Sequence, residues 1–262
     1  MNTRSLHPFS ISIWMLSSLM AGLLLLSSGC AGPSVGEQQL KAQRKFEEAQ
    51  NMSPKEKQKK IKKLKEAILM APKEPMYRVA LGNVYFRELK LNKAERLYLS
   101  AIKVDPEYMG TYRQLGRLYM QKNDWDNAVY YLNRALTESN VIAPVQLYNW
   151  LAYCHYRKGS LAKAEKAWLK ALDIHESDQI RLNLALAYKQ GDQIKLAKAS
   201  LLKALELNPK LMGAHFALGE IYYRSNKFAQ AKKHFNRVIH LEPFSEQAKV
   251  SKKILKQLIP KK

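Results

Sequence analysis

The chain has 262 residues, and an apolar content of 47% excludes a protein that stays disordered for lack of a core. Its 44 Lys and Arg against 22 Asp and Glu give a formal charge of +22. This excess either keeps the chain soluble or attracts an acidic partner such as anionic lipid, acidic cell-wall polymer or an acidic protein.

The first 29 residues have the layout of a secretory signal peptide. An almost wholly apolar run from Phe9 to Leu26 follows a short basic start, and small residues lead from it to Cys30. The alternative is an uncleaved membrane anchor, because the run is nearly long enough to span a bilayer. For an exported chain we expect no nucleic-acid partner.

Cys30 stands where a bacterial lipoprotein carries its lipid. The small residues before it resemble the lipobox, in which the signal is cut before the cysteine and the new terminus is acylated, with palmitate among the chains. The residue that follows is Ala31 rather than Asp, and this resemblance implies attachment to the outer membrane, facing the periplasm. Lipidation of Cys30 would leave Cys154 without a disulfide partner.

Residues 30–40 are predicted to be the lipidated cysteine and a polar tether, and residues 41–74 a degenerate first repeat. The second helix of that repeat fits, with Leu64 and Ala67 before Pro72. Its first helix does not, because Glu47 and Glu48 occupy sites where an apolar residue and a small residue are expected. A terminal repeat is expected to be atypical, since one of its faces meets water.

From Pro75 onward the chain repeats itself with a period of about 34 residues. Each unit ends in a small-large apolar pair, and in most units a proline follows four residues later, as in Ala101-Ile102 with Pro106 and Ala204-Leu205 with Pro209. Proline stops the second helix of a unit. The predicted units are 75–108, 109–144, 145–177, 178–211 and 212–243, followed by a capping helix with a basic tail over 244–262.

Within each unit, a small residue on the first helix lets the second helix approach closely. The small residues are Gly82, Gly116, Ala152, Ala185 and Gly219. Together with Leu and Tyr on the first helix and Ala on the second, they resemble the tetratricopeptide repeat. The third unit departs by placing His155 where Tyr is usual. The resemblance implies an all-α right-handed superhelix, or α-solenoid, with about five full repeats, a degenerate N-terminal unit and a C-terminal capping helix.

The same resemblance implies a concave groove lined by the first helices. The predicted groove residues are Asn83, Phe86, Arg87, Arg113, Arg117, Asn149, Tyr153, Tyr156, Arg157, Lys189, Phe216, Tyr223 and Arg224, with Gln121, Leu182 and Gln190 beside them. The set is aromatic and cationic, with Glu220 as the one acid, so it suits an extended or helical peptide with acidic residues. The alternative is that the aromatic residues only fill the inner wall.

Two basic stretches stand apart from this groove. Residues Lys55–Lys65 hold seven lysines and one acid, and residues Lys249–Lys262 hold six lysines and no acid. They are either solvated helix faces or contact surfaces for anionic lipid or cell-wall polymer.

No motif of an enzyme is present. The histidines form no paired metal-binding motif, and neither a nucleophile elbow nor a glycine-rich phosphate loop occurs. Cys154 lies two residues after Ala152, where small packed residues are normal, so we interpret it as core. We predict no catalytic residue, no metal and no cofactor.

A signal peptide with a cysteine, followed by about six such units, resembles the type IV pilus pilotins (the PilF, PilW and Tgl group). The resemblance implies an outer-membrane lipoprotein that helps the pilus secretin assemble, with a secretin subunit as its protein partner. The alternatives are a general envelope scaffold for cell-wall enzymes or outer-membrane assembly, and a component of polysaccharide export.

Overall fold

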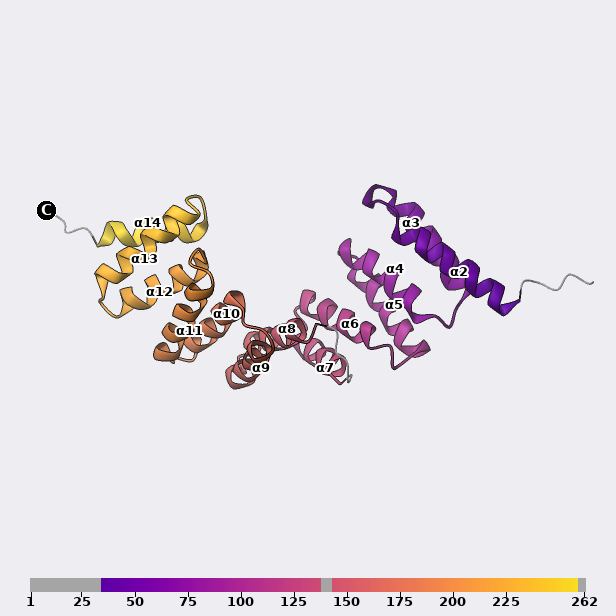
Figure 1. Ribbon diagram of the computed structural model, residues 1–262, viewed down its shortest axis with the longest axis horizontal. Coiled ribbons are helices and arrows are strands. Elements are labelled where there is room, and N and C mark those ends of the chain that lie inside the picture. The colour runs from indigo at the N-terminus through magenta and orange to yellow at the C-terminus, as the bar shows by residue number, and fades with distance from the viewer. Residues whose placement is uncertain (1–33, 138–142, 259–262) are drawn as a thin grey trace, which may run out of the picture. The chain divides into compact units, whose positions relative to one another are not determined.

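The computed structural model describes residues 34–137 and 143–258, and these residues form 13 α-helices, one short 3₁₀ helix and no strand (Figure 1). The predicted all-α class is confirmed. The predicted signal peptide and Cys30 lie outside the described residues. The chain divides into two compact units, Met1–Pro72 and Lys73–Lys262.

The first unit is a helix pair of α2 (Val35–Gln50) and α3 (Lys57–Met70), with the 3₁₀ helix η1 (Pro54–Glu56) between them. The Ser34 hydroxyl caps α2 by accepting a hydrogen bond from the Glu37 backbone N–H at 3.2 Å. Because of this cap, α2 takes in residues 35–40, which the sequence places in the tether.

In this pair the close-packing positions on α2 are Ala42 and Ala49, not Glu47 and Glu48. Both alanines are fully buried, two turns apart on one face of the helix. Glu48 lies on the exposed side and pairs with Lys63 of α3. The two helices of the first unit therefore pack through alanines. The buried Ala49 lies one residue after Glu48, the position that the register of the later repeats gives to the small residue.

The second unit consists of consecutive antiparallel helix pairs, in which each pair also contacts the next. The pairs are α4 (Pro75–Arg87) with α5 (Leu91–Val104), α6 (Met109–Gln121) with α7 (Trp125–Ala135), α8 (Pro144–Arg157) with α9 (Leu161–Ile174), α10 (Asp178–Gln190) with α11 (Ile194–Leu207), and α12 (Met212–Arg224) with α13 (Phe228–Leu241) (Figure 1). The last helix, α14 (Glu246–Gln257), packs on α13.

Each turn inside these pairs contains one residue with a left-handed backbone. The residues are Leu89 (φ 56°), Asn123 (φ 57°), Gly159 (φ 72°), Asp192 (φ 56°) and Asn226 (φ 56°). Gly, Asn and Asp tolerate this conformation, which ends a helix and reverses the chain. Leu89 is the exception among these residues, because a left-handed backbone is energetically unfavourable for a residue with a large side chain.

The glycines of the first helices stand where a side chain would collide with the second helix. A Cβ atom on Gly82 would lie 2.4 Å from Tyr98 Cε1, and one on Gly116 or Gly219 would lie 2.7 Å from Leu132 or Phe235. The close helix approach predicted from these residues is present.

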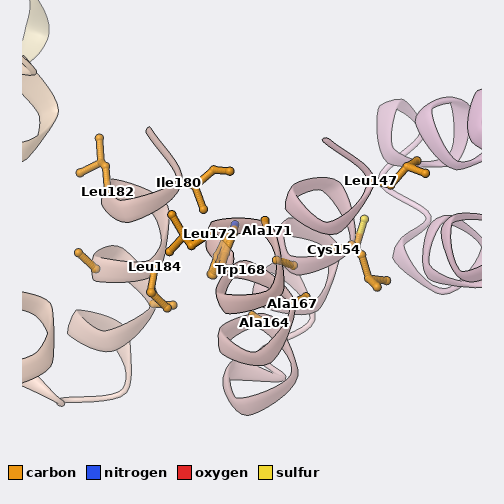
Figure 2. Close-up of a cluster of buried hydrophobic side chains, with 14 of the residues drawn as sticks. Leu147, Cys154, Ala164, Ala167, Trp168, Ala171, Leu172, Ile180, Leu182 and Leu184 are labelled. Carbon is orange, nitrogen blue, oxygen red and sulfur yellow. The ribbon is translucent and has the colours of Figure 1, made fainter. Parts of the chain in front are cut away.

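The core runs continuously through the helix pairs of the second unit, and Figure 2 shows its part between α8, α9 and α10. Trp168 of α9 is 1% exposed and lies among Ala164, Ala171 and Leu172 of its own helix and residues of α10. Cys154 of α8 is buried in the same core, and burial raises the pKa of its thiol to about 12. The thiol therefore stays protonated and fills space as a small apolar group.

Tyrosine–glutamate hydrogen bonds join some consecutive pairs. The Tyr119 hydroxyl on α6 donates to Glu95 Oε1 on α5 at 2.6 Å, and Lys122 Nζ donates to the other oxygen of that carboxylate at 2.6 Å. The Tyr188 hydroxyl on α10 donates to Glu165 Oε1 on α9 at 2.8 Å. These bonds fix the first helix of one pair against the second helix of the preceding pair.

Candidate functional site

The first helices of the pairs, α4, α6, α8, α10 and α12, form one face of the second unit because each contacts the next. We call it the first-helix face. The predicted groove residues belong to these five helices.

A pocket of about 520 Å³ opens on this face between α4, α6, the start of α7 and α8. This central pocket is lined by Phe86, Arg117, Met120, Gln121, Asn123, Trp125, Trp150, Tyr153 and Arg157. It brings together the predicted Phe86, Arg117, Tyr153 and Arg157 from three different helices. The volume lies in the range of pockets that bind small ligands or peptide side chains.

Arg117 lies between two aromatic rings of the central pocket. Its guanidinium carbon is 5.1 Å from the centroid of Phe86 and 5.5 Å from that of Trp150. One of its N–H groups donates to Gln114 Oε1 at 3.2 Å. A guanidinium held between rings keeps further N–H donors for a carboxylate. Because its side chain is already ordered, little conformational entropy is lost on binding.

Arg157 forms the second arginine–aromatic group. Its guanidinium carbon is 4.6 Å from the Trp125 centroid and 5.8 Å from the Tyr153 centroid, and its Nη1 donates to the Tyr153 hydroxyl at 2.9 Å. Trp125 and Tyr153 meet edge to face, with centroids 5.9 Å apart. The pocket therefore offers two oriented cations on aromatic supports.

Three predicted groove residues of α4 and α8 contact the second helix of their own pair. Asn83 accepts from the Tyr98 hydroxyl at 2.7 Å, and Asn149 accepts from Trp168 Nε1 at 2.8 Å. The Tyr156 ring lies 5.9 Å from that of Trp168. These side chains hold the helix pairs together.

The other predicted residues lie outside the central pocket. Lys189 pairs with Glu220, which neutralises both charges on that part of the face. Phe216 packs against Phe235 and Tyr223 against Phe228, Arg87 and Arg224 are exposed, and Arg113 is half-buried.

Comparison with known proteins decides the family. The family described as the cilia and flagella-associated protein 70 C-terminal domain, a tetratricopeptide-repeat family, matches residues 29–254. The chain belongs to this family. The predicted tetratricopeptide-repeat fold is thereby confirmed, and the match indicates a repeat scaffold rather than a catalytic family.

Solved structures agree with this fold. PilW, a type IV pilus biogenesis factor, is 17% identical with a TM-score of 0.68 over 80% of this chain and 97% of its own. PilF of Pseudomonas aeruginosa is 13% identical with a TM-score of 0.65 over 84% and 97%. YrrB, a repeat protein with an unusual peptide-binding site, is 18% identical with a TM-score of 0.60 over 72% and 97%. At these identities the likeness shows the fold alone.

The chain spans about a quarter of the length of two curated relatives, at 20% and 24% identity, and a tenth of the length of a third, at 26% identity. None of the described helices of this tetratricopeptide-repeat protein combines the length and apolarity needed to cross a bilayer. Within residues 34–137 and 143–258, no three His, Cys, Asp or Glu side chains are grouped as metal ligands.

Sequence reasoning missed Met120, Asn123, Trp125 and Trp150 in the central pocket. A signal for Trp150 exists, because Trp150, Tyr153 and Arg157 follow the spacing i, i+3, i+7 that places residues on one helix face. Trp125 had no such signal, since it begins the second helix of its pair.

Two histidines away from this pocket form a hydrogen-bonded pair. His215 Nε2 lies 3.1 Å from the Pro209 carbonyl oxygen, so this nitrogen must carry the hydrogen and donate. When both rings are neutral, His215 Nδ1 accepts from His234 Nδ1 at 3.0 Å. Burial, together with the charges of His215 and Lys233, lowers the pKa of His234 to about 4.

We expect stability to fall as the pH drops from 6.5 toward 4. His234 binds a proton with its ordinary pKa of 6.5 when unfolded but near 4 when folded, so the unfolded chain takes up more protons in this window. After discounting for solvent screening of the partly exposed ring, the loss should be about 1 kcal/mol. Urea unfolding measured across this pH range checks it. His234→Gln should flatten this part of the profile, and an unchanged slope in that variant would contradict the assignment.

Proposed function

We propose that this protein-interaction scaffold binds an extended segment of its partner in the central pocket, through acidic side chains of that segment. The observation that carries the proposal is the pair of arginines, Arg117 and Arg157, each supported by aromatic rings. Rings supply contact area with few rotatable bonds, and guanidinium groups supply paired donors for carboxylates.

We further propose that the scaffold is an outer-membrane lipoprotein, anchored at Cys30 and facing the periplasm, that binds a secretin subunit during assembly of a type IV pilus. The lipobox-like end of the signal sequence and the likeness of fold to PilW and PilF support this assignment. The lysines of residues 55–65 would then face anionic lipid or cell-wall polymer.

Crosslinking in the native cells tests both proposals. A photoreactive residue replaces Tyr153, with Phe244, which is 91% exposed and outside the pocket, as the control position. A secretin subunit captured only from position 153, in an outer-membrane fraction that Cys30→Ala depletes, supports both. Capture of a cell-wall or export protein at position 153 would contradict the pilus assignment, but it would support the central pocket as the binding site. A folded, anchored variant that captures nothing would contradict the pocket.

The double variant Arg117→Ala/Arg157→Ala should weaken binding of the captured partner about 10- to 100-fold. Both side chains are exposed, so the fold should be unaffected. Calorimetric titration with the purified partner measures the loss. Arg96→Ala/Lys103→Ala, which removes two exposed cations of α5, is the matched control, and an equal loss in that variant would mean that only net charge matters.

A further inference from the structure

Helix α8 borders a second pocket on the side opposite the central pocket. Trp150, Tyr153 and Arg157 line the central pocket, whereas Tyr148 and His155 line the other. With 3.6 residues per turn, the two sets point about half a turn apart. One helix therefore separates the two pockets.

The second pocket has an apolar floor and a basic rim. It encloses about 300 Å³ between α7, α8 and α9 and is lined by Asn133, Leu136, Tyr148, Leu151, His155, Lys163, Lys166, Ala167 and Lys170. We call it the lysine pocket. Its three lysines follow i, i+3, i+7 along α9, a length of about 10 Å at 1.5 Å per residue. Lys170 Nζ also lies 5.4 Å from the Tyr148 ring centroid.

The lysine pocket lies where the repeat pattern is broken. At the α5/α6 and α9/α10 contacts, a tyrosine of the first helix bonds a glutamate of the preceding pair. In α8, His155 occupies the repeat position of these tyrosines. In α7, Val129 occupies the repeat position of the glutamates. The apolar side chain of Val129 offers no acceptor for such a bond, and His155 lines the pocket instead.

The charge of this surface is unbalanced. Within residues 34–137 and 143–258, no acid lines the pocket, and Lys163, Lys166 and Lys170 form no ion pair. Burial, followed by the positive charges of Lys163 and Lys158, lowers the pKa of His155. Of these two lysines, Lys158 pairs with Asp126, whereas Lys163 has no ion-pair partner among the described residues.

We propose that the lysine pocket is a second docking site, for an acidic amphipathic helix of a protein partner. Such a helix of about two turns would insert one apolar side chain between Leu136 and Leu151 and place acidic residues against the three lysines. The exposed ring of Tyr130, 58% accessible and one turn before Asn133 on α7, extends the contact surface.

The test uses two synthetic helical peptides and the full chain in detergent. One peptide has a leucine stripe flanked by Glu at i, i+3 and i+7, and the other has Gln in place of each Glu. The acidic peptide should bind more tightly than the Gln peptide. Lys163→Glu/Lys166→Glu should weaken its binding about 10-fold or more. Lys195→Glu/Lys232→Glu, which makes the same charge change on exposed residues of α11 and α13, should change it little.

A second variant separates pocket filling from charge. His155→Tyr restores the aromatic residue of the repeat and should weaken the acidic peptide several-fold while leaving the net charge unchanged. Equal affinity of the acidic peptide for the wild type and for Lys163→Glu/Lys166→Glu would overturn the proposal. So would a failure of both peptides to bind when vesicles containing phosphatidylglycerol bind in a Lys163- and Lys166-dependent manner, because the site would then be for lipid headgroups.

Discussion

Trp168→Ala should lower the free energy of unfolding by about 3–5 kcal/mol, because it removes the largest fully buried side chain of the core and leaves a cavity. It also removes the donor to Asn149 Oδ1, 2.8 Å away, and the ring on which Tyr156 packs. Since each pair of an array is stabilised by its neighbours, the loss should extend to the helix pairs on both sides. Urea unfolding followed by circular dichroism measures it.

Two further variants separate volume from hydrogen bonding. Trp168→Phe keeps most of the ring and loses the hydrogen bond, so it should cost less than Trp168→Ala. Trp150→Ala removes a half-buried tryptophan from the central pocket of the same helix pair and should cost about 1 kcal/mol or less, apart from its effect on binding. A loss for Trp168→Ala no larger than that for Trp150→Ala would contradict its central place in the core.

Gly82→Ala should destabilise the protein by about 2–3 kcal/mol, although alanine is the better helix former. The added Cβ would lie 2.4 Å from Cε1 of Tyr98. That ring is fully buried and its hydroxyl is bonded to Asn83, so it cannot swing aside. The change in unfolding free energy is read from urea melts.

The matched control is Gly110→Ala on α6, where the new Cβ would meet the Tyr108 ring at an ordinary 3.6 Å. This variant should gain about 0.5 kcal/mol from helix propensity. Gly82→Ala/Tyr98→Leu copies the Ala185 and Leu201 combination of the fourth predicted repeat and should recover part of the loss. A stabilising effect of Gly82→Ala, like that expected for Gly110→Ala, would show that the clash is relieved elsewhere.

The fold could be predicted because its determinants are local and repeated. Gly82 and Gly116 recur at one register, and their position on the first helix follows from helical periodicity alone. The first unit lacked this signal: its packing through Ala42 and Ala49 depends on contacts with α3 that the repeat register does not contain.

The candidate site could be predicted only in part. Arg117 and Arg157 were found because the register assigns them to the first-helix face. The same register assigns Asn149 there, yet its oxygen is taken by Trp168 of the second helix. Trp125 was missed for the opposite reason, since it reaches Tyr153 through the contact between consecutive pairs. The repeat register predicts on which face of a helix a side chain lies. It does not predict which neighbouring side chain contacts it there.

The ion pairs within the chain have a kinetic consequence. Acids such as Glu48, Glu95 and Glu220 are held by lysines of the same chain, so an approaching partner meets mainly the excess positive charge. Long-range attraction of this kind speeds the encounter of an acidic partner and weakens as salt shortens its range. The lifetime of the complex depends instead on close contacts, such as the rings around Arg117 and Arg157. The net positive charge thus governs the association rate, and the close contacts govern the dissociation rate. Added salt should therefore lower mainly the association rate.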